Sequence, residues 1–502
     1  MKSPRADHPD SATVTRREFL RTAALNVGVL VVLPACSYSS RSSSTSSGMA
    51  VGASTTTAGA PRSPGAAQDP WAQVPGILAR IVPPTFPSRD IDITAHGARA
   101  DGTTDCTAAI AAAVKACNAA GGGRVVVPAG RFLTGPIHLL DRVNLHVKEG
   151  ATLAFVTDPA RYLPPVLTRW EGMEMMGYSP LIYAHGVNNI AISGTGVLDG
   201  QATEQNWWAW KGGQNRPLPN QLAARAKLFE LAEAGAPVAQ RVFGAGSYLR
   251  PQFIQFMRCR NVLIEGVTIR NSPMWEVHPV ECVNVTVRNL HIDTHGPNND
   301  GCDPESCRDV LIEGCLFDTG DDCIAIKSGR NADGRRLNIP TENVIVRNCT
   351  MKDGHGGVTI GSEISGGVRN VFVEKCTMDS PNLDRALRFK NNAMRGGLLD
   401  HIYMRDCTIG EVAEGVLSID LYYEEGEKGP FTPIVRDVEL RNVTSKKSMY
   451  GLYMRAYPKS EISNIRVIDC RFDGVAKGNV TDGVRGLVFR NTRVNGQLVA
   501  QP

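Results

Sequence analysis

The chain has 502 residues, a formal net charge of +4 and 42% hydrophobic residues. Such a small net charge, without a basic run interleaved with aromatic residues, argues against a nucleic-acid partner. A single globular core stops growing near ~250–300 residues, so a chain of this length either splits into domains or forms an elongated repeat.

The N-terminus predicts an export signal. The sequence TRREFL from Thr15 precedes an apolar stretch at 23–33, which is too short to span a bilayer comfortably and resembles a bacterial twin-arginine signal. The segment ends in LPAC at Cys36, which resembles a lipoprotein cleavage box. We expect residues 1–36 to be removed or lipid-anchored at Cys36, and the protein to work in the periplasm, outside the cell or at the cell envelope.

A linker and a helix follow the predicted signal. Residues 37–87 are rich in Ser, Thr and Pro and are expected to be flexible. Thr104 or Asp105 can cap a helix that ends at the glycines 121–123. This helix would cover one end of a core whose first strands are predicted at 124–127 and 143–147.

A nine-residue phrase recurs along the second half of the chain. It starts with Asn, Asp or His, has apolar second and fourth positions, turns mostly at Gly, Asn or Asp, and resumes with apolar seventh and ninth positions. The starts lie 23–36 residues apart, which is solenoid spacing with loops of varying length. They are Asn261, Asn284, Asp309, Asn343, Asn370, His401, Asp437 and Asn464, with a weaker unit at Asn189.

The repeat predicts an all-β fold. One strand per coil on each of several faces, stacked ~4.8 Å apart, gives a right-handed parallel β-helix. Each coil buries its apolar residues only against its neighbours, so the size limit of a globular core does not apply. We therefore expect one parallel β-helix catalytic domain over 88–500, with an N-terminal capping helix.

The cysteines follow the repeat. Those at position seven of the unit are interpreted as a ladder of small buried apolar residues: Cys315, Cys349, Cys376, Cys407 and Cys470. The cysteines at 302, 307 and 323 fall in predicted loops and are better candidates for disulfides. No Cys/His spacing indicates a zinc site.

One interval between units is too long for a coil. The 72 residues from Asn189 to Asn261 include an insertion at 203–250 with a predicted helix at 221–234. It forms either a packing flap or a wall of the active site.

Carboxylates gather at coil spacing. Asp300 and Asp321 are 21 residues apart, close to one coil, Asp322 adjoins Asp321, and His355 follows one coil later. Clustered carboxylates raise one another's pKa, so one can hold a proton while another stays ionised, as glycoside hydrolysis requires. Each Asp alone would more often cap a turn, but the set beside a histidine favours catalysis.

Two cations follow on the next coil. Arg388 and Lys390 lie on the same side of a predicted strand, with Phe389 pointing inward. Their charges suit an anionic substrate such as a sugar acid, and we expect them to pair with the substrate carboxylate and not with a structural partner.

The four motifs resemble the signatures of the polygalacturonase family, glycoside hydrolase family 28, over residues 88–480. They are Asn298-Asn299-Asp300, Gly320-Asp321-Asp322, Gly354-His355-Gly356 and Arg388-Phe389-Lys390.

The resemblance implies an inverting mechanism and a role for each motif residue. Asp321 would be the general acid, Asp300 and Asp322 would hold and activate the water, and His355 would assist protonation of the acid. Asn298, Arg388, Lys390 and a tyrosine one coil later would bind galacturonate; of Tyr422 and Tyr423, Tyr423 is preferred.

Two further stretches resemble the bacterial, exo-acting branch of this family. They are 272–279, which contains Trp275 and His278, and 303–306. Exo action needs a blocked groove end, for which the 203–250 insertion is the candidate. Trp275 and His278 either line the groove or belong to the core.

The expected activity is hydrolysis of α-1,4-galacturonosidic bonds in pectin by a secreted monomer, with no cofactor, no metal and no nucleic-acid partner. Rhamnogalacturonan and xylogalacturonan stay open as substrates. A calcium-dependent pectate lyase and a catalytically silent, polysaccharide-binding β-helix are the alternatives from other classes.

Overall fold

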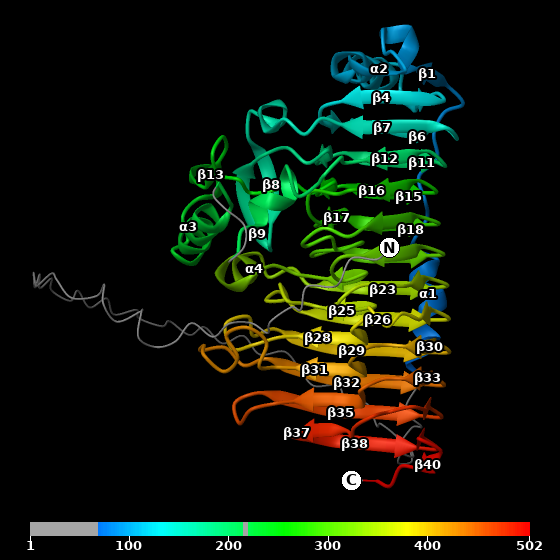
Figure 1. Ribbon diagram of the computed structural model, residues 1–502, viewed down its shortest axis with the longest axis vertical. Coiled ribbons are helices and arrows are strands. Elements are labelled where there is room, and N and C mark those ends of the chain that lie inside the picture. Colours follow the sequence, from blue (N-terminus) through cyan, green and yellow to red (C-terminus); the bar gives the residue numbers. More distant parts are fainter. Residues whose placement is uncertain (1–68, 214–218, 502) are drawn as a thin grey trace, which may run out of the picture. The chain divides into compact units, whose positions relative to one another are not determined.

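The computed structural model describes residues 69–213 and 219–501. Residues 67–502 form one compact unit, whose strands stack coil upon coil (Figure 1). The predicted signal and Cys36 lie outside the described residues. No helix among the described residues is long and apolar enough to cross a membrane.

The first face of the solenoid is a parallel sheet, 13-stranded in the described part of the chain, and it contains the first half of every predicted repeat unit. Its strands, in stacking order, are β1 (Asp90–Asp92), β3 (Gly123–Val127), β6 (Val143–Val147), β11 (Asn188–Gly194), β15 (Arg260–Glu265), β18 (Val283–Arg288), β20 (Arg308–Glu313), β23 (Thr341–Arg347), β26 (Val368–Glu374), β29 (Leu398–Arg405), β32 (Ile434–Arg441), β35 (Glu461–Ile468) and β38 (Val484–Arg490). The parallel β-helix predicted from the repeat is confirmed.

The second face contains the second half of each unit and is parallel except at its last pair. Its strands are β2 (Asp101–Asp105), β4 (Gly130–Thr134), β7 (Ala151–Phe155), β12 (Val197–Asp199), β16 (Thr268–Arg270), β19 (His291–Thr294), β21 (Leu316–Thr319), β24 (Thr350–Met351), β27 (Thr377–Met378), β30 (Thr408–Glu411), β33 (Thr444–Lys447), β36 (Arg471–Phe472), β39 (Arg493–Val494) and β40 (Gln497–Leu498).

The third face is interrupted. A sheet of β5 (Ile137–His138), β10 (Ile182–His185), β14 (Ile254–Met257) and β17 (Val277–Val280) ends where residues 300–305 cross, and Cys302 pairs with both Val277 and Ile324. The face continues as β22 (Ile324–Ile326), β25 (Val358–Ile360), β28 (Arg385–Lys390), β31 (Gly415–Asp420), β34 (Tyr450–Arg455) and β37 (Val480–Asp482). The predicted catalytic motifs meet at this interruption.

The first residue of each repeat unit is left-handed, which explains its chemistry. Asn343 has φ +57° and Asn370 has φ +56°, a conformation that Asn tolerates better than most residues. The side chains also form a ladder, because Nδ2 of Asn370 donates to Oδ1 of Asn343 at 3.1 Å and Nδ2 of Asn343 donates to Oδ1 of Asp309 at 3.0 Å. Position one thus fixes both the corner and the stacking.

The capping helix is confirmed at one end of the solenoid (Figure 1). It is α2 (Thr107–Ala119), with Ile110, Val114 and Cys117 buried as predicted. The carboxylate of Asp105 accepts the Thr107 N–H at 2.9 Å. The other helices in the described residues are η1 (Pro70–Gln73), α1 (Val74–Leu78), η2 (Ile93–His96), η3 (Pro159–Tyr162), η4 (Trp207–Lys211), α3 (Leu222–Glu233), η5 (Val238–Gln240) and α4 (Asn331–Leu337).

The insertion packs beside the solenoid over a separate small sheet. That sheet consists of the antiparallel pair β8 (Val166–Trp170) and β9 (Met173–Gly177), to which β13 (Val242–Phe243) adds in parallel. Helix α3 forms where a helix was predicted. It joins an apolar cluster with Trp170 and Trp275, so the insertion is tied to the coils that precede the catalytic motifs.

The predicted linker extends too far. Its described end, from Pro70, forms η1 and α1, whose buried Trp71 packs on Phe372 with ring centroids 5.3 Å apart. Nη2 of Arg80 also lies 2.7 Å from Oδ1 of Asp309. Apolar side chains in this Pro-rich segment bury themselves on the outer surface of the first face, so it is ordered and not a linker.

The disulfide candidates are wrong. Every cysteine in the described residues is a free, buried thiol, including those at 302, 307 and 323. The segment 300–305 belongs to the third face and is not a solvent loop, so Cys302 points into the core like the position-seven cysteines.

Candidate active site

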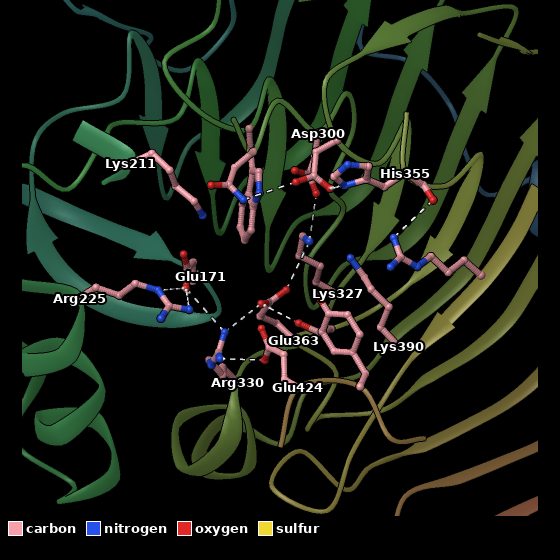
Figure 2. A pocket seen from close by; sticks show the side chains of 16 residues that line it. Glu171, Lys211, Arg225, Asp300, Lys327, Arg330, His355, Glu363, Lys390 and Glu424 are labelled. Carbon is pink, nitrogen blue, oxygen red and sulfur yellow. Dashed lines mark hydrogen bonds and ion pairs between the residues drawn. The ribbon is translucent and has the colours of Figure 1, made fainter. Parts of the chain in front are cut away.

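The candidate site is an open pocket with a cavity volume of about 240 Å³, at the interruption of the third face. Figure 2 shows charged side chains converging on it from the solenoid and from the insertion. Among the predicted residues the pocket is lined by Asn298, Asp300, Asp321, His355, Arg388, Lys390 and Tyr423.

The three predicted carboxylates converge. One oxygen from each of Asp300, Asp321 and Asp322 lies within 4.8 Å of the others. Asp300 lies on the segment that interrupts the third face, and the other two lie between β21 and β22, one coil further along. Coil stacking therefore brings together residues about 21 positions apart, as the spacing predicted.

Asp321 is paired with the predicted histidine. Nδ1 of His355 lies 3.0 Å from Oδ1 of Asp321, while Oδ2 of Asp321 has only a long 3.5 Å contact with Asn298. Burial raises the pKa of Asp321, but the charges of His355 and Lys390 outweigh it and hold this pKa below its ordinary value. The same pairing raises the pKa of His355 to about 9. Both shifts favour an ionised Asp321 beside a protonated His355 at neutral pH.

Asp322 lies beneath the pocket and is held by the two predicted cations. Nζ of Lys390 lies 2.5 Å from Oδ2, and Nη1 of Arg388 lies 3.3 Å from Oδ1, which also accepts the hydroxyl of Thr359 at 2.8 Å. Burial raises the pKa of Asp322, but the two cations lower it further than burial raises it. The expectation that these cations lack a structural partner is wrong, because strand spacing along β28 places both over a buried aspartate.

Asp300 belongs to a more deeply buried group. Nζ of Lys327 lies 3.5 Å from Asp300, 3.8 Å from Asp303 and 3.3 Å from Glu363. Burial, followed by the charges of Asp303 and Asp321, raises the pKa of Asp300 well above its ordinary value. Oδ1 of Asp300 is buried and accepts no hydrogen bond from the described residues.

The structure distinguishes the two tyrosines. Tyr423 lines the pocket, with its ring 5.6 Å from Nζ of Lys390. Tyr422 packs against Tyr457 outside the pocket, with ring centroids 5.3 Å apart. The preference for Tyr423 as the pocket residue agrees with this geometry.

Trp275 and His278 take different roles. Trp275 lines the pocket, and Nζ of Lys327 lies 4.2 Å from its ring centroid. His278 is fully buried beneath it, where Nε2 lies 3.0 Å from Glu305 and Nδ1 lies 2.9 Å from Gln255. His278 is therefore a core residue.

Sequence reasoning missed one side of the pocket. Glu171 from the β8–β9 turn lies 2.8 Å from Arg225 of α3 and 3.6 Å from Arg330, which also lies 3.2 Å from Glu363 and 3.3 Å from Glu424. We call this group the ion-pair wall (Figure 2). Its members come from segments outside the repeat unit, so the spacing of the units did not point to them. Glu363 alone offered a signal in the sequence, because it lies one coil after Lys327, a charged residue that directly follows the buried strand β22.

The three carboxylates are close enough together to hold a cation. However, Lys390 lies 2.5 Å from one of them and Lys327 lies 3.5 Å from another. Ammonium groups at these positions already neutralise the cluster, which disfavours a divalent ion.

Comparisons with known proteins agree with this geometry. The model of "Glycosyl hydrolases family 28" matches residues 245–484. The solved hyperthermoactive exopolygalacturonase from Thermotoga maritima is 46% identical, with a TM-score of 0.82, over 85% of this chain and 96% of that one. The exo-poly-alpha-D-galacturonosidase of Dickeya chrysanthemi is 28% identical over 381 residues, covering 71% of this chain and 62% of that protein.

The fold is shared more widely. The polygalacturonase from Erwinia carotovora has a TM-score of 0.59 at 24% identity, over 82% of this chain and 98% of that one. With nearly half of the residues identical across almost the whole Thermotoga enzyme, the chain belongs to glycoside hydrolase family 28 and is a glycosidase of the polygalacturonase type.

Proposed function

We propose that the enzyme hydrolyses α-1,4-galacturonosidic bonds of pectic galacturonan, from the end of the polymer and with inversion. The observation that carries this proposal is the meeting of three carboxylates, Asp300 and Asp321 in the pocket and Asp322 beneath it, with a histidine and several cations. An anionic sugar chain suits such a pocket, and the relatives named above act on galacturonan.

Asp321 is the general acid, and it must be protonated before the bond breaks. His355, whose raised pKa favours the protonated form at neutral pH, can supply the required proton, because its Nδ1 lies 3.0 Å from Oδ1 of Asp321. A substrate carboxylate at Arg388 and Lys390 offsets the charges that keep Asp321 ionised, so its pKa rises and the proton moves from the imidazolium to the acid. Oδ2 of Asp321 then faces the leaving oxygen.

Asp300 and Asp322 hold and activate the water. Asp322 is kept ionised by Lys390 and Arg388. Asp300 lines the pocket, and burial, followed by the charges of Asp303 and Asp321, raises its pKa. Protonation of Asp321 removes one of those charges and so favours the ionised form of Asp300, which is the form that can accept the proton of the attacking water.

The ion-pair wall supports the proposed action from the polymer end. Glu171, Arg225 and Arg330 close one side of the pocket with contacts of 2.8 and 3.6 Å. The cavity volume of about 240 Å³ is below the ~300–1,000 Å³ of pockets for drug-sized ligands. Such a pocket accommodates the end of a sugar chain better than its middle.

Product analysis on de-esterified polygalacturonate tests this function. We expect reducing ends without ultraviolet absorbance, a rate unchanged by EDTA, and monomer or one short oligomer from the first time points. Calcium dependence with rising absorbance would instead establish a lyase, and a ladder of intermediate oligomers would overturn only the exo assignment. Rhamnogalacturonan and xylogalacturonan assayed in parallel test the alternative substrates.

Export remains part of the proposal. The twin-arginine motif and Cys36 support secretion or lipid anchoring. Fractionation of cells that express the full chain, with and without Arg16→Lys and Arg17→Lys, tests the route: cytoplasmic retention of the double variant is expected.

A further inference from the structure

One cation of the pocket differs from the rest. Lys211, the last residue of η4, lines the pocket but makes no ion pair or hydrogen bond with any other described residue. In contrast, Arg225 lies 2.8 Å from Glu171, Lys327 lies 3.3 Å from Glu363, and Lys390 lies 2.5 Å from Asp322. Among the described pocket cations, Lys211 is the one with no carboxylate within ion-pair distance, although the charges of Glu171 and Asp321 act on it from farther away.

The backbone that carries Lys211 is fixed in place. Trp207 of η4 is buried, and its ring lies 4.7 Å from that of Trp210. Nε1 of Trp208 donates to the carbonyl of Ser272 at 2.8 Å, next to the catalytic coils. The side chain of Lys211 is therefore presented to the pocket by a rigid turn and not by a freely moving loop.

The position of Lys211 complements that of the known cations. Figure 2 shows its amine extending into the pocket from the side opposite Lys390, with Asp300 between them. Burial, followed by the charge of Arg250, lowers the pKa of Lys211 further than the charges of Glu171 and Asp321 raise it. An ammonium group whose burial is only partly compensated gains from an incoming anion.

We propose that Lys211 binds the carboxylate of the galacturonate residue on the opposite side of the scissile bond from the residue held by Arg388 and Lys390. This inference rests on the proposed function and specifies its substrate. Two carboxylates flanking one bond occur in galacturonan, whereas rhamnogalacturonan alternates galacturonate with an uncharged sugar. Lys211 thus selects consecutive acidic residues.

The test compares Lys211→Met with a matched control, Lys227→Met, on trigalacturonate. Lys227 lies on α3 of the same insertion but is exposed and pairs only with Glu230, at 2.7 Å. Because a charge-assisted hydrogen bond is lost, we expect kcat/KM to fall about 10- to 100-fold in Lys211→Met. Lys227→Met should match the wild type, and Lys211→Arg, which keeps the charge, should recover most of the loss.

A binding measurement separates charge recognition from a general defect. In the Asp321→Asn background, calorimetry should show that Lys211→Met weakens digalacturonate binding but leaves the binding of its methyl ester unchanged. Two results would overturn this inference but not the proposed function. One is that Lys211→Met loses the same affinity for the acid as for the ester; the other is that its kcat/KM equals that of an active wild type. A wild type that does not cleave trigalacturonate would overturn the proposed function and this inference together.

Discussion

Nδ1 of His355 lies 3.0 Å from Oδ1 of Asp321, and this contact decides which group holds the proton in the resting enzyme. The imidazolium keeps Asp321 ionised, whereas the proposed reaction requires Asp321 to be protonated. Substrate binding must therefore redistribute protons among groups that are already in contact. The pH dependence and the variants of this pair test that requirement directly.

Asp321→Asn should lower kcat about 10²- to 10⁴-fold, because the amide cannot deliver a proton. Substrate binding and melting temperature should change little, since the side chains are nearly isosteric. Asp318→Asn is the matched control: it lies on β21 of the same coil and does not line the pocket. A rate like that of the wild type in Asp321→Asn would remove this residue from the role of acid.

The rate should fall as pH rises through about 9, the raised pKa of His355. Above it the His355–Asp321 pair has lost its proton. In His355→Gln the alkaline limb of the kcat/KM profile should move to lower pH, because Asp321 loses its proton source. His295→Gln, an exposed histidine outside the pocket, is the control. An alkaline limb unchanged by His355→Gln would contradict the assignment.

The same pair has a stability consequence with a defined sign. Because the folded-state pKa of His355 is raised above 6.5, its stabilising contribution is complete below the unfolded-state value and is lost as pH rises through about 9. The His355 side chain is half exposed, so solvent screening keeps this effect small. Melting temperatures of wild type and His355→Gln should converge at alkaline pH.

Lys390→Met should reduce both stability and activity. It leaves Asp322 buried with only Arg388 and Thr359 as partners, and breaking a buried ion pair typically costs about 3–5 kcal/mol. The pKa of Asp322, which Lys390 lowers, should rise, so the acid limb of the kcat/KM profile should move to higher pH.

Urea unfolding of Lys390→Met, Asp322→Asn and the double variant measures this coupling. The double variant should be more stable than Lys390→Met, because the uncompensated carboxylate is gone. Strictly additive losses in stability would show that the 2.5 Å contact contributes nothing to folding.

Asn343→Gly and Asn343→Ala should differ. Both remove the ladder hydrogen bonds to Asp309 and Asn370, at 3.0 and 3.1 Å. Only Ala must also adopt φ +57° with a Cβ, which costs about 1–2 kcal/mol more. Thermal unfolding should rank wild type above Gly and Gly above Ala. A stability of the Ala variant equal to that of Gly would exclude backbone strain as the reason for asparagine here.

The first product should be the β-anomer. Both oxygens of Asp322 are occupied by Lys390, Arg388 and Thr359, and Oδ2 of Asp300 lies 3.5 Å from Lys327. Asp322 is thus poorly placed to attack the sugar itself, whereas a carboxylate oxygen that accepts one hydrogen bond can still accept another from water. One oxygen from each of Asp300, Asp321 and Asp322 lies within 4.8 Å of the others. This separation is shorter than the ~6.5–9.5 Å between the two catalytic carboxyl groups that is usual for inverting enzymes. Proton NMR during early hydrolysis decides the outcome, because an α-anomer would indicate a covalent intermediate.

The repeat made most of the fold predictable, because each unit encodes a left-handed corner, two strand segments and a stacking position. Asp300, Asp321 and His355 were predictable for the same reason: they occupy nearly equivalent places on successive coils. Lys390 lies on the next coil, further along the strand β28. Stacking then brings them together whatever the loop lengths are.

The residues that could not be predicted lie outside the repeat units, where the sequence has no regular spacing. Glu171 and Lys211 reach the pocket through the small sheet and the insertion, and their positions depend on packing of Trp170 and Trp207 that no spacing encodes. Cys302 was misread because the segment around it departs from the unit while still belonging to a face.

The stacking of the first face is continuous across the insertion. β11 pairs in parallel with β15, so that Ala191 lies opposite Leu263, although 72 residues separate the units that begin at Asn189 and Asn261. The excursion leaves the solenoid and rejoins it without a change of register. Insertions, deletions and substitutions can therefore accumulate in this segment while the three carboxylates stay in place. The segment that forms one wall of the pocket and the coils that carry the three carboxylates are free to diverge independently.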